Sequence, residues 1–272
     1  MAEDGIISYG NRLAMLAEEH PDRNAVIFVA QDGQETQLTR LELERYTNQL
    51  ARLLKHHGLQ TNQMLVIGLP NSVEHLALAF AGWKVGALVL PLRAAMPQWE
   101  RDRVLEVGEP ALVAADWDNV PYPSINREAL ASHFQYEDGP LPDCIPQPGR
   151  AIASGGSTGR PKIIVDPRPW GMRMGENYFG FGSGYRPGQV QLIAGPLYHN
   201  SPFGWMHSGV FDDHQIVMME RFDAGRAVDL IEKYRINFMF LSPTMMGRIA
   251  RLEDVTQRDF SSIEAVYHTS AP

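Results

Sequence analysis

The sequence is poor in cysteine, and it lacks the features of an exported chain. Cys144 is its single cysteine, so no disulfide can form within the chain. The first ten residues, MAEDGIISYG, carry acidic residues where a signal peptide carries basic residues followed by an apolar run. These two absences predict a reduced, cytoplasmic setting.

Long apolar runs and long runs of one charge are also missing. The most apolar stretch, 75–92, has Lys84 near its middle and Pro91 near its end, which favours a buried helix and strand over a membrane span. The net charge is -8 without a long block of like charges, so neither nucleic acid nor an anionic membrane is an expected partner. His207 and His214 lack the spacing of zinc ligands, so no metal site is predicted.

The chain alternates between the apolar periodicities that distinguish strands from helices. Thr39 opens a capping-box pattern, apolar residues recur at helical spacing up to Gly58, and Asn71 is a candidate cap for the following helix. Helices are expected at 40–57, 73–85 and 98–107, and strands at 64–69, 87–90, 111–114, 152, 163–166, 190–194, 215–219, 237–241 and 265–268. This alternation predicts an α/β fold with mostly parallel sheets, and the proline-rich stretch 116–150 is a connector and a candidate subdomain boundary.

The stretch ASGGSTGRPK, residues 153–162, concentrates glycines and hydroxyl residues between two expected strands. Glycines allow backbone N–H groups to approach phosphate oxygens closely, and the hydroxyls and Lys162 add donors and a positive charge. A P-loop needs Gly-Lys-Ser/Thr at the start of a helix, whereas here Pro161 precedes the lysine and Ile-Ile-Val follows it. A flexible Gly/Ser surface loop is the plain alternative. The flanking strands and the Thr-Gly-Arg-Pro-Lys ending favour a phosphate-binding loop.

This loop resembles the signature of the adenylate-forming acyl- and aryl-CoA synthetases, Thr-Ser-Gly-Thr-Thr-Gly-x-Pro-Lys-Gly. Gly155 stands in place of the usual serine and Ile163 in place of the final glycine. The Ser-Gly-Gly-Ser-Thr-Gly variant is similar to that of bacterial bile-acid or steroid acid-CoA ligases. The resemblance extends over nearly the whole chain, through segments 38–58, 66–91, 196–200, 234–246 and 269–272.

The resemblance implies a reaction in two steps. A carboxylic acid and ATP give acyl-AMP and pyrophosphate, and the acyl group then passes to CoA, with Mg²⁺ as the metal. It implies catalytic roles for Lys162, Thr158 and His199. It implies nucleotide contacts at Ser154, Gly155, Gly156, Ser157, Thr158, Gly159, Lys162, Ser270, Ala271 and Pro272, and substrate contacts at His199, Asn200, Phe203, Met206 and Thr269. Phe203 and Met206 fit a pocket lining and an ordinary core equally well.

The resemblance also implies a domain organisation. Residues 1–272 would be a truncated N-terminal AMP-binding domain, with two stacked subdomains, without the C-terminal lid domain and with little activity by itself; a homodimer would be typical of the family. Two other functions stay open: an acyl-AMP ligase that loads a carrier protein, and a nucleotide-binding module without catalysis. Fatty, aromatic and steroid acids all remain candidate substrates.

Overall fold

The computed structural model describes residues 5–154, 161–176 and 184–268, and the chain divides into two compact units. Unit 1 comprises Met1–Asp22, Arg40–Pro70 and Glu74–Glu176, and unit 2 comprises Arg23–Thr39, Asn71–Val73 and Asn177–Pro272. The proline-rich connector 116–150 lies wholly within unit 1, so the chain divides elsewhere than at the predicted boundary.

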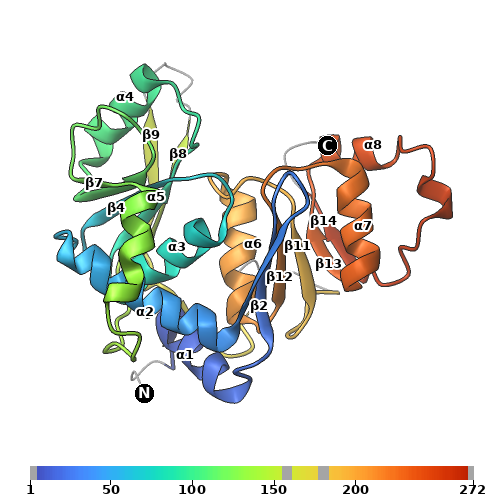
Figure 1. The fold of residues 1–272 in the computed structure, drawn as a ribbon, viewed down its shortest axis with the longest axis horizontal. Helices are drawn as coiled ribbons and strands as arrows, with labels where there is room; N and C mark the ends of the chain where they lie inside the picture. Colours follow the sequence, from blue (N-terminus) through green and yellow to red (C-terminus); the bar gives the residue numbers. More distant parts are fainter. Residues whose placement is uncertain (1–4, 155–160, 177–183, 269–272) are drawn as a thin grey trace. The chain divides into compact units, whose positions relative to one another are not determined.

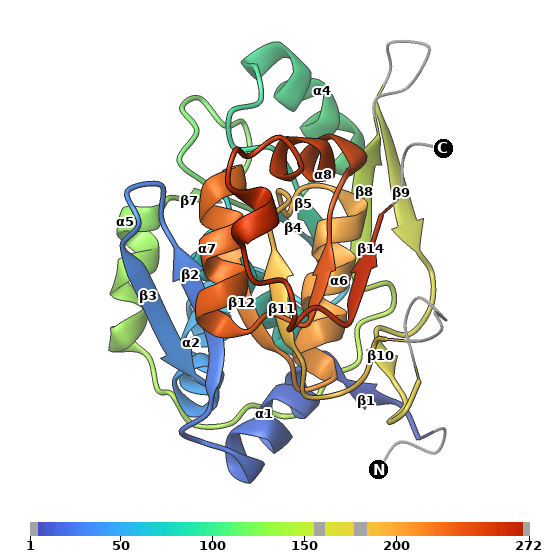
Figure 2. The same cartoon turned by 90° about the vertical axis from the view of Figure 1, so that its right-hand side faces the viewer.

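Unit 1 contains a six-stranded sheet of order β7-β6-β4-β5-β8-β9, parallel except for β9, which runs antiparallel to β8 (Figure 2). Its strands are β4 (Met64–Gly68), β5 (Leu88–Pro91), β6 (Leu112–Ala115), β7 (Ser124–Ile125), β8 (Arg150–Ser154) and β9 (Lys162–Asp166), and a separate small sheet pairs β1 (Ile7–Ser8) with β10 (Gly171–Met172). The helices are α1 (Tyr9–Glu19), α2 (Arg40–His56), α3 (Val73–Val85, whose first residue is assigned to unit 2), α4 (Gln98–Gly108), α5 (Arg127–Leu130) and the 3-10 helix η1 (Ala131–Gln135).

Helix α3 is buried, and together with β5 it confirms the buried helix and strand predicted for the apolar stretch 75–92. Apolar side chains lie on all sides of the helix, which suits a helix buried among other elements. Trp83 packs edge-on against Phe80 and lies beside Tyr9 and Trp170. Lys84 is buried with its charge paired, as a buried ammonium requires. Among the described residues, helices long and apolar enough to cross a membrane are lacking.

Unit 2 contains a second six-stranded sheet, of order β14-β13-β11-β12-β2-β3, parallel except for β3, which runs antiparallel to β2. Its elements are β2 (Asn24–Val29), β3 (Glu35–Thr39), β11 (Val190–Ile193), α6 (Asn200–Phe211), β12 (Gln215–Met219), α7 (Ala224–Tyr234), β13 (Phe238–Phe240), α8 (Pro243–Ile249), the 3-10 helix η2 (Val255–Gln257) and β14 (Ala265–Tyr267). The predicted α/β class with mostly parallel sheets is confirmed.

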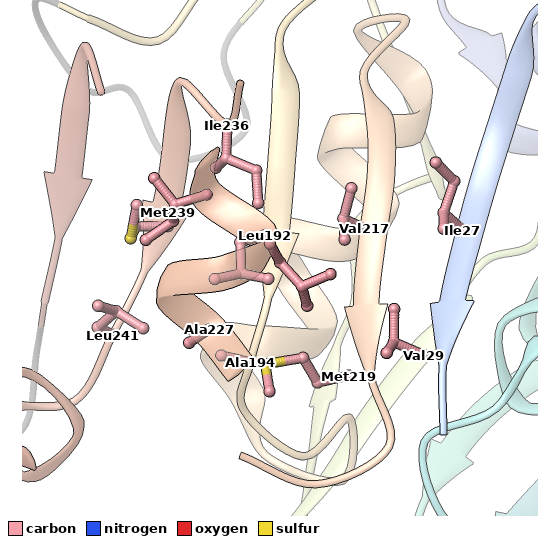
Figure 3. Close-up of a cluster of buried hydrophobic side chains, with 12 residues drawn as sticks. Ile27, Val29, Leu192, Ala194, Val217, Met219, Ala227, Ile236, Met239 and Leu241 are labelled. Atoms are coloured by element: carbon pink, nitrogen blue, oxygen red, sulfur yellow. The ribbon is translucent and has the colours of Figure 1, made fainter. Parts of the chain in front are cut away.

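Helices cover both faces of the sheet in unit 2, with α6 on one face and α7 on the other (Figure 1). Side chains alternate along each strand, so Leu192 and Val217 face α7 in one apolar cluster (Figure 3), whereas Gln191 faces α6 and donates to the Trp205 carbonyl oxygen at 3.0 Å. Both faces of the central strands are therefore buried, which explains their near-continuous apolar sequence.

One predicted helix cap is wrong. Ser72 and not Asn71 directly precedes α3, and the Asn71 side-chain amide hydrogen-bonds to the backbone of residues 195, 197 and 219 in unit 2. Its sequence position before an apolar helix was compatible with either role, because a carboxamide can satisfy a helix end or a loop backbone.

Candidate active site

The predicted phosphate-binding loop connects the two strands of a β-hairpin in unit 1. Strands β8 and β9 pair antiparallel, and their last register pair, Ser154 and Lys162, brackets residues 155–161. Ser154 is half-buried and Lys162 is exposed. Because Lys162 begins a strand, the structure agrees with the rejection of a P-loop, in which the lysine opens a helix.

Most predicted nucleotide contacts fall outside the described residues. These are Gly155, Gly156, Ser157, Thr158 and Gly159 in the loop and Ser270, Ala271 and Pro272 at the end of the sequence, together with the substrate residue Thr269. Of the nucleotide set, the structure therefore places Ser154 and Lys162, opposite each other at the base of the hairpin.

A cavity of about 450 Å³ in unit 2 is lined in part by two of the predicted substrate residues, His199 and Asn200. It lies where the chain leaves the carboxyl ends of β11 and β13, and the volume is in the range of small-molecule sites. Its lining consists of Gly195, Pro196, His199, Asn200, Ser201, Pro202, Phe240, Ser242 and Met245. The wall is apolar over the proline rings, Phe240 and Met245, with polar groups confined to the His199–Ser201 turn and Ser242.

The cavity occupies a topological switch point of the sheet. Strands β11 and β13 are parallel neighbours, but the chain after β11 passes through α6 to β12 on one side, and the chain after β13 passes through α8 to β14 on the other side. The two outgoing connections diverge and leave a crevice at the carboxyl edge, the usual ligand site in open α/β sheets. Sheet topology therefore supports a binding function independently of the motif.

His199 and Asn200 stand at the mouth of this crevice and are both exposed. The His199 backbone N–H donates to the Pro196 carbonyl oxygen at 3.1 Å, and its own carbonyl accepts from Phe203 N–H at 3.2 Å. Asn200 is the first residue of α6, a 12-residue helix whose terminal N–H groups favour a negative charge. The turn, the imidazole and the helix end suit a carboxylate.

Two other predicted substrate residues have a different position. Phe203 and Met206 are fully buried in unit 2 and are not among the described residues that line the cavity. The Phe203 ring instead lies edge-on to His207, 5.8 Å between centroids. Helix α6 is buried on all sides from Pro202 to Phe211, so these two side chains belong to the core of unit 2.

The lining residues that sequence reasoning did not assign come from two strand ends. Pro196 and the Leu-Ser-Pro-Thr segment around Ser242 belong to stretches with family resemblance, but they lie 46 positions apart. Only the pairing of β11 with β13 brings Phe240, Ser242 and Met245 to the same crevice as His199. The available signal was the Ser-Pro start of α8, where Ser242 accepts from Met245 N–H at 3.3 Å.

Two buried basic groups in unit 1 have lowered pKa values. Burial lowers the pKa of His75 to about 4, although its Nδ1 lies 3.0 Å from the Leu69 carbonyl oxygen. Burial also lowers the pKa of Lys84 to about 8, against the opposing effect of Glu44, 2.6 Å away. Within the described part of the chain, clusters of three or more metal-ligating side chains are lacking.

Comparison with known proteins identifies the class. The profile of the AMP-binding enzyme family matches residues 13–272, and the chain therefore belongs to this family. The chain is 26% identical to 4-coumarate–CoA ligase 1 of Oryza sativa subsp. japonica over 267 residues, which cover 86% of this chain and 47% of that protein. It is 25% identical to 2-succinylbenzoate–CoA ligase of Bacillus licheniformis over 264 residues, covering 92% and 52%. The chain spans about half the length of these curated relatives.

Solved structures agree with this assignment at the level of the fold. The inhibitor-bound N-terminal domain of FACL13 from Mycobacterium tuberculosis has a TM-score of 0.82 at 18% identity, covering 97% of this chain and 70% of that one. The N-terminal subdomain of Klebsiella oxytoca NpsA has a TM-score of 0.79 at 19% identity, covering 97% and 66%. The chain thus has the fold of the N-terminal part of adenylate-forming enzymes.

Proposed function

We propose that this chain carries the ATP- and acid-binding part of an acid–CoA ligase. The enzyme joins a hydrophobic carboxylic acid to ATP, releases pyrophosphate, and passes the acyl group from acyl-AMP to CoA. The observation that carries the proposal is the switch-point cavity with His199 and Asn200 at its mouth. The names of the relatives, which are ligases of 4-coumarate and 2-succinylbenzoate, support the same reaction class.

The first step needs stabilised charge rather than a nucleophilic side chain of the protein. A carboxylate oxygen of the acid attacks the α-phosphorus of ATP, and the bond from that phosphorus to the pyrophosphate oxygen breaks. Preorganised donors that stabilise the developing charge lower the barrier. We assign this role to Lys162, Thr158, Ser154 and the glycine-rich backbone between the hairpin strands, with Ser270 to Pro272 as adenine contacts.

The cavity of unit 2 would orient the acid for that attack. The exposed imidazole of His199 and the N-terminus of α6 would face the carboxylate, and the apolar wall from Phe240 and Met245 would contact the acyl group. In the second step the CoA sulfur attacks the acyl carbonyl carbon and AMP leaves. Mg²⁺ would supply charge neutralisation when bound, but the described residues offer no ligand cluster for it, so we assign it no residues.

The rest of the proposal concerns the sequence that activity requires, the class of acid and the acceptor of the acyl group. We propose that activity requires sequence beyond that of residues 1–272, including a C-terminal lid domain, in a cytoplasmic enzyme that is compatible with a homodimer. Steroid, fatty and aryl acids are the candidate substrates, the first on the strength of the Ser-Gly-Gly-Ser-Thr-Gly segment. Transfer to a carrier protein in place of CoA would identify the enzyme as an acyl-AMP ligase.

Carboxylate-dependent ATP–pyrophosphate exchange tests the proposal. We expect exchange with one acid class in the enzyme that contains this chain, reduced on the order of 100-fold or more by Lys162→Ala or Thr158→Ala. Lys55→Ala, at an exposed lysine near the end of α2, is the matched control and should leave exchange unchanged. ATP binding without exchange for any of the three acid classes would instead identify a nucleotide-binding module.

A further inference from the structure

Asn71 is a buried polar residue that the proposed reaction leaves unused. It is 5% exposed, and among the described residues its carboxamide hydrogen-bonds to backbone groups of unit 2 alone. The amide nitrogen donates to the carbonyl oxygens of Gly195 and Met219, each at 3.0 Å, and the amide oxygen accepts from Leu197 N–H at 2.8 Å. One side chain therefore hydrogen-bonds to three backbone groups of buried residues.

These three groups determine the position of one wall of the cavity. Gly195 and Pro196 line the cavity, and the Asn71 bonds are made to the backbone on both sides of Pro196. Proline has no N–H, so the next backbone donor of this turn is Leu197 N–H, and Asn71 accepts from it. The bond to Met219 fixes the turn relative to the carboxyl end of β12.

The same hydrogen bonds lead to His199. The Pro196 carbonyl oxygen, held between the two Asn71 contacts, accepts from His199 N–H, and His199 in turn precedes the first turn of α6. Close packing leaves little room for a shifted turn, since a Cβ on Gly195 would lie 2.7 Å from Pro202 Cγ. A rigid connection therefore runs from Asn71 to the residue that faces the acid.

We propose that Asn71 is a positioning residue for the carboxylic-acid site, acting through the Gly195–Leu197 turn on His199; this inference rests on the proposed function. Asn71 has no contact with the acid itself. It supplies two donors and one acceptor in the arrangement that the turn requires, and neither Asp nor Ala can supply all three.

Substitution in the complete enzyme tests the assignment. Asn71→Ala should lower kcat/KM for the acid on the order of 100-fold, the effect of a misplacement of about 1 Å, while the KM for ATP stays nearly unchanged. Asn71→Asp, which replaces the donors with oxygen, should act in the same direction. The matched control is Asn237→Ala, since Asn237 joins the amino ends of β11 and β13, accepting from Val190 N–H at 2.7 Å. It should lose stability but retain kcat/KM.

Two further readouts separate positioning from a general loss of structure. In a His199→Ala background, Asn71→Ala should have a much smaller effect on kcat/KM, because both changes act on one contact; additive effects would overturn the proposal. Amide hydrogen exchange should accelerate at 197–203 in Asn71→Ala and not in Asn237→Ala. If no acid supports activity, the proposed function fails, and hydrogen exchange alone still decides: unchanged protection at 197–203 would refute the role of Asn71.

Discussion

The two sheets of the molecule repeat one topology and differ at the place where a ligand would bind. In unit 1, β4 is followed by α3, β5, α4, β6 and β7; in unit 2, β11 is followed by α6, β12, α7, β13 and, beyond α8, β14. Both sheets place the first strand between the second and the third, with the fourth outside the third, so both contain a switch point. Strands β4 and β6 form the one in unit 1, and β11 and β13 form the one in unit 2.

The switch point of unit 1 is occupied by a side chain of the protein. The Trp117 ring lies so close to Gly68, the last residue of β4, that a Cβ there would overlap the ring. The Trp117 indole N–H donates to the Ala94 carbonyl oxygen, and the Arg101 guanidinium lies 5.4 Å from the ring centre. At the corresponding place, unit 2 has the cavity with His199. A shared topology therefore provides the crevice, and the side chains after the strands decide whether it is filled.

The helices that follow the first strands differ in charge as well. Helix α3 carries Lys84, whose ammonium donates to Glu44 and to the Asn48 side-chain oxygen, both at 2.6 Å, whereas the sequence of α6 has no Lys, Arg, Asp or Glu. Loss of one partner of the Lys84–Glu44 pair would leave a buried charge unpaired, which is costly for stability. Helix α6 of unit 2 has no charged side chain and so cannot be destabilised in this way.

The largest expected effect is therefore that of Lys84→Met. Glu44 would remain largely buried without its cation, and we expect the free energy of unfolding to fall by about 3–5 kcal/mol in urea denaturation. Adding Glu44→Gln should restore part of the loss. The control is Arg235→Met, which removes an exposed pair with Asp259 and should cost about 1 kcal/mol or less. Equal losses in the two variants would contradict the contrast between the units.

A second effect concerns His75 in the same helix. The unfolded chain binds a proton near the ordinary pKa of 6.5, but the folded chain does so only near 4, so falling pH favours unfolding throughout this window. Stability contributed by the neutral ring is complete above pH 6.5, and about 3 kcal/mol is lost by pH 4. Denaturation at several pH values, compared with His75→Gln, isolates this slope. His57→Gln, at an exposed histidine, should keep the full slope.

A third effect would make unit 1 resemble unit 2. Trp117→Ala should open the filled switch point and lower the free energy of unfolding by about 2 kcal/mol, less than for a fully buried tryptophan because Trp117 is only half-buried. Added indole should then raise the melting temperature of the variant and leave the unmodified protein unaffected, since only the variant has room for it. A variant that does not respond to indole would show that the crevice collapses.

Local sequence signals predicted the elements better than the site. Strands such as 215–219 and the helix at 73–85 have the predicted bounds, because apolar periodicity and stop signals act over a few residues. The cavity depends on Phe240 and Met245 lying across from His199, which follows from strand order and not from any local pattern. Asn71 shows the same limit: its local context suggests a cap, whereas its actual partners are more than 120 positions away.

The smallest effect is the one that measures what the open switch point selects. Phe240 ends β13 and contributes the largest apolar side chain of the cavity lining. Phe240→Ala should enlarge the cavity and shift relative kcat/KM toward bulkier acids on the order of tenfold, about 1.4 kcal/mol, in the range that differences of one or two methylene groups produce in apolar pockets. Phe238→Ala is the matched control, because Phe238 lies in the same strand, is fully buried and does not line the cavity among the described residues. If Phe238→Ala shifted the preference equally, the change would come from loosening of the sheet and not from the shape of the crevice. If only Phe240→Ala shifted the acid preference, acid selection would depend on the side chains that line the open switch point of unit 2. Trp117 fills the corresponding switch point of unit 1.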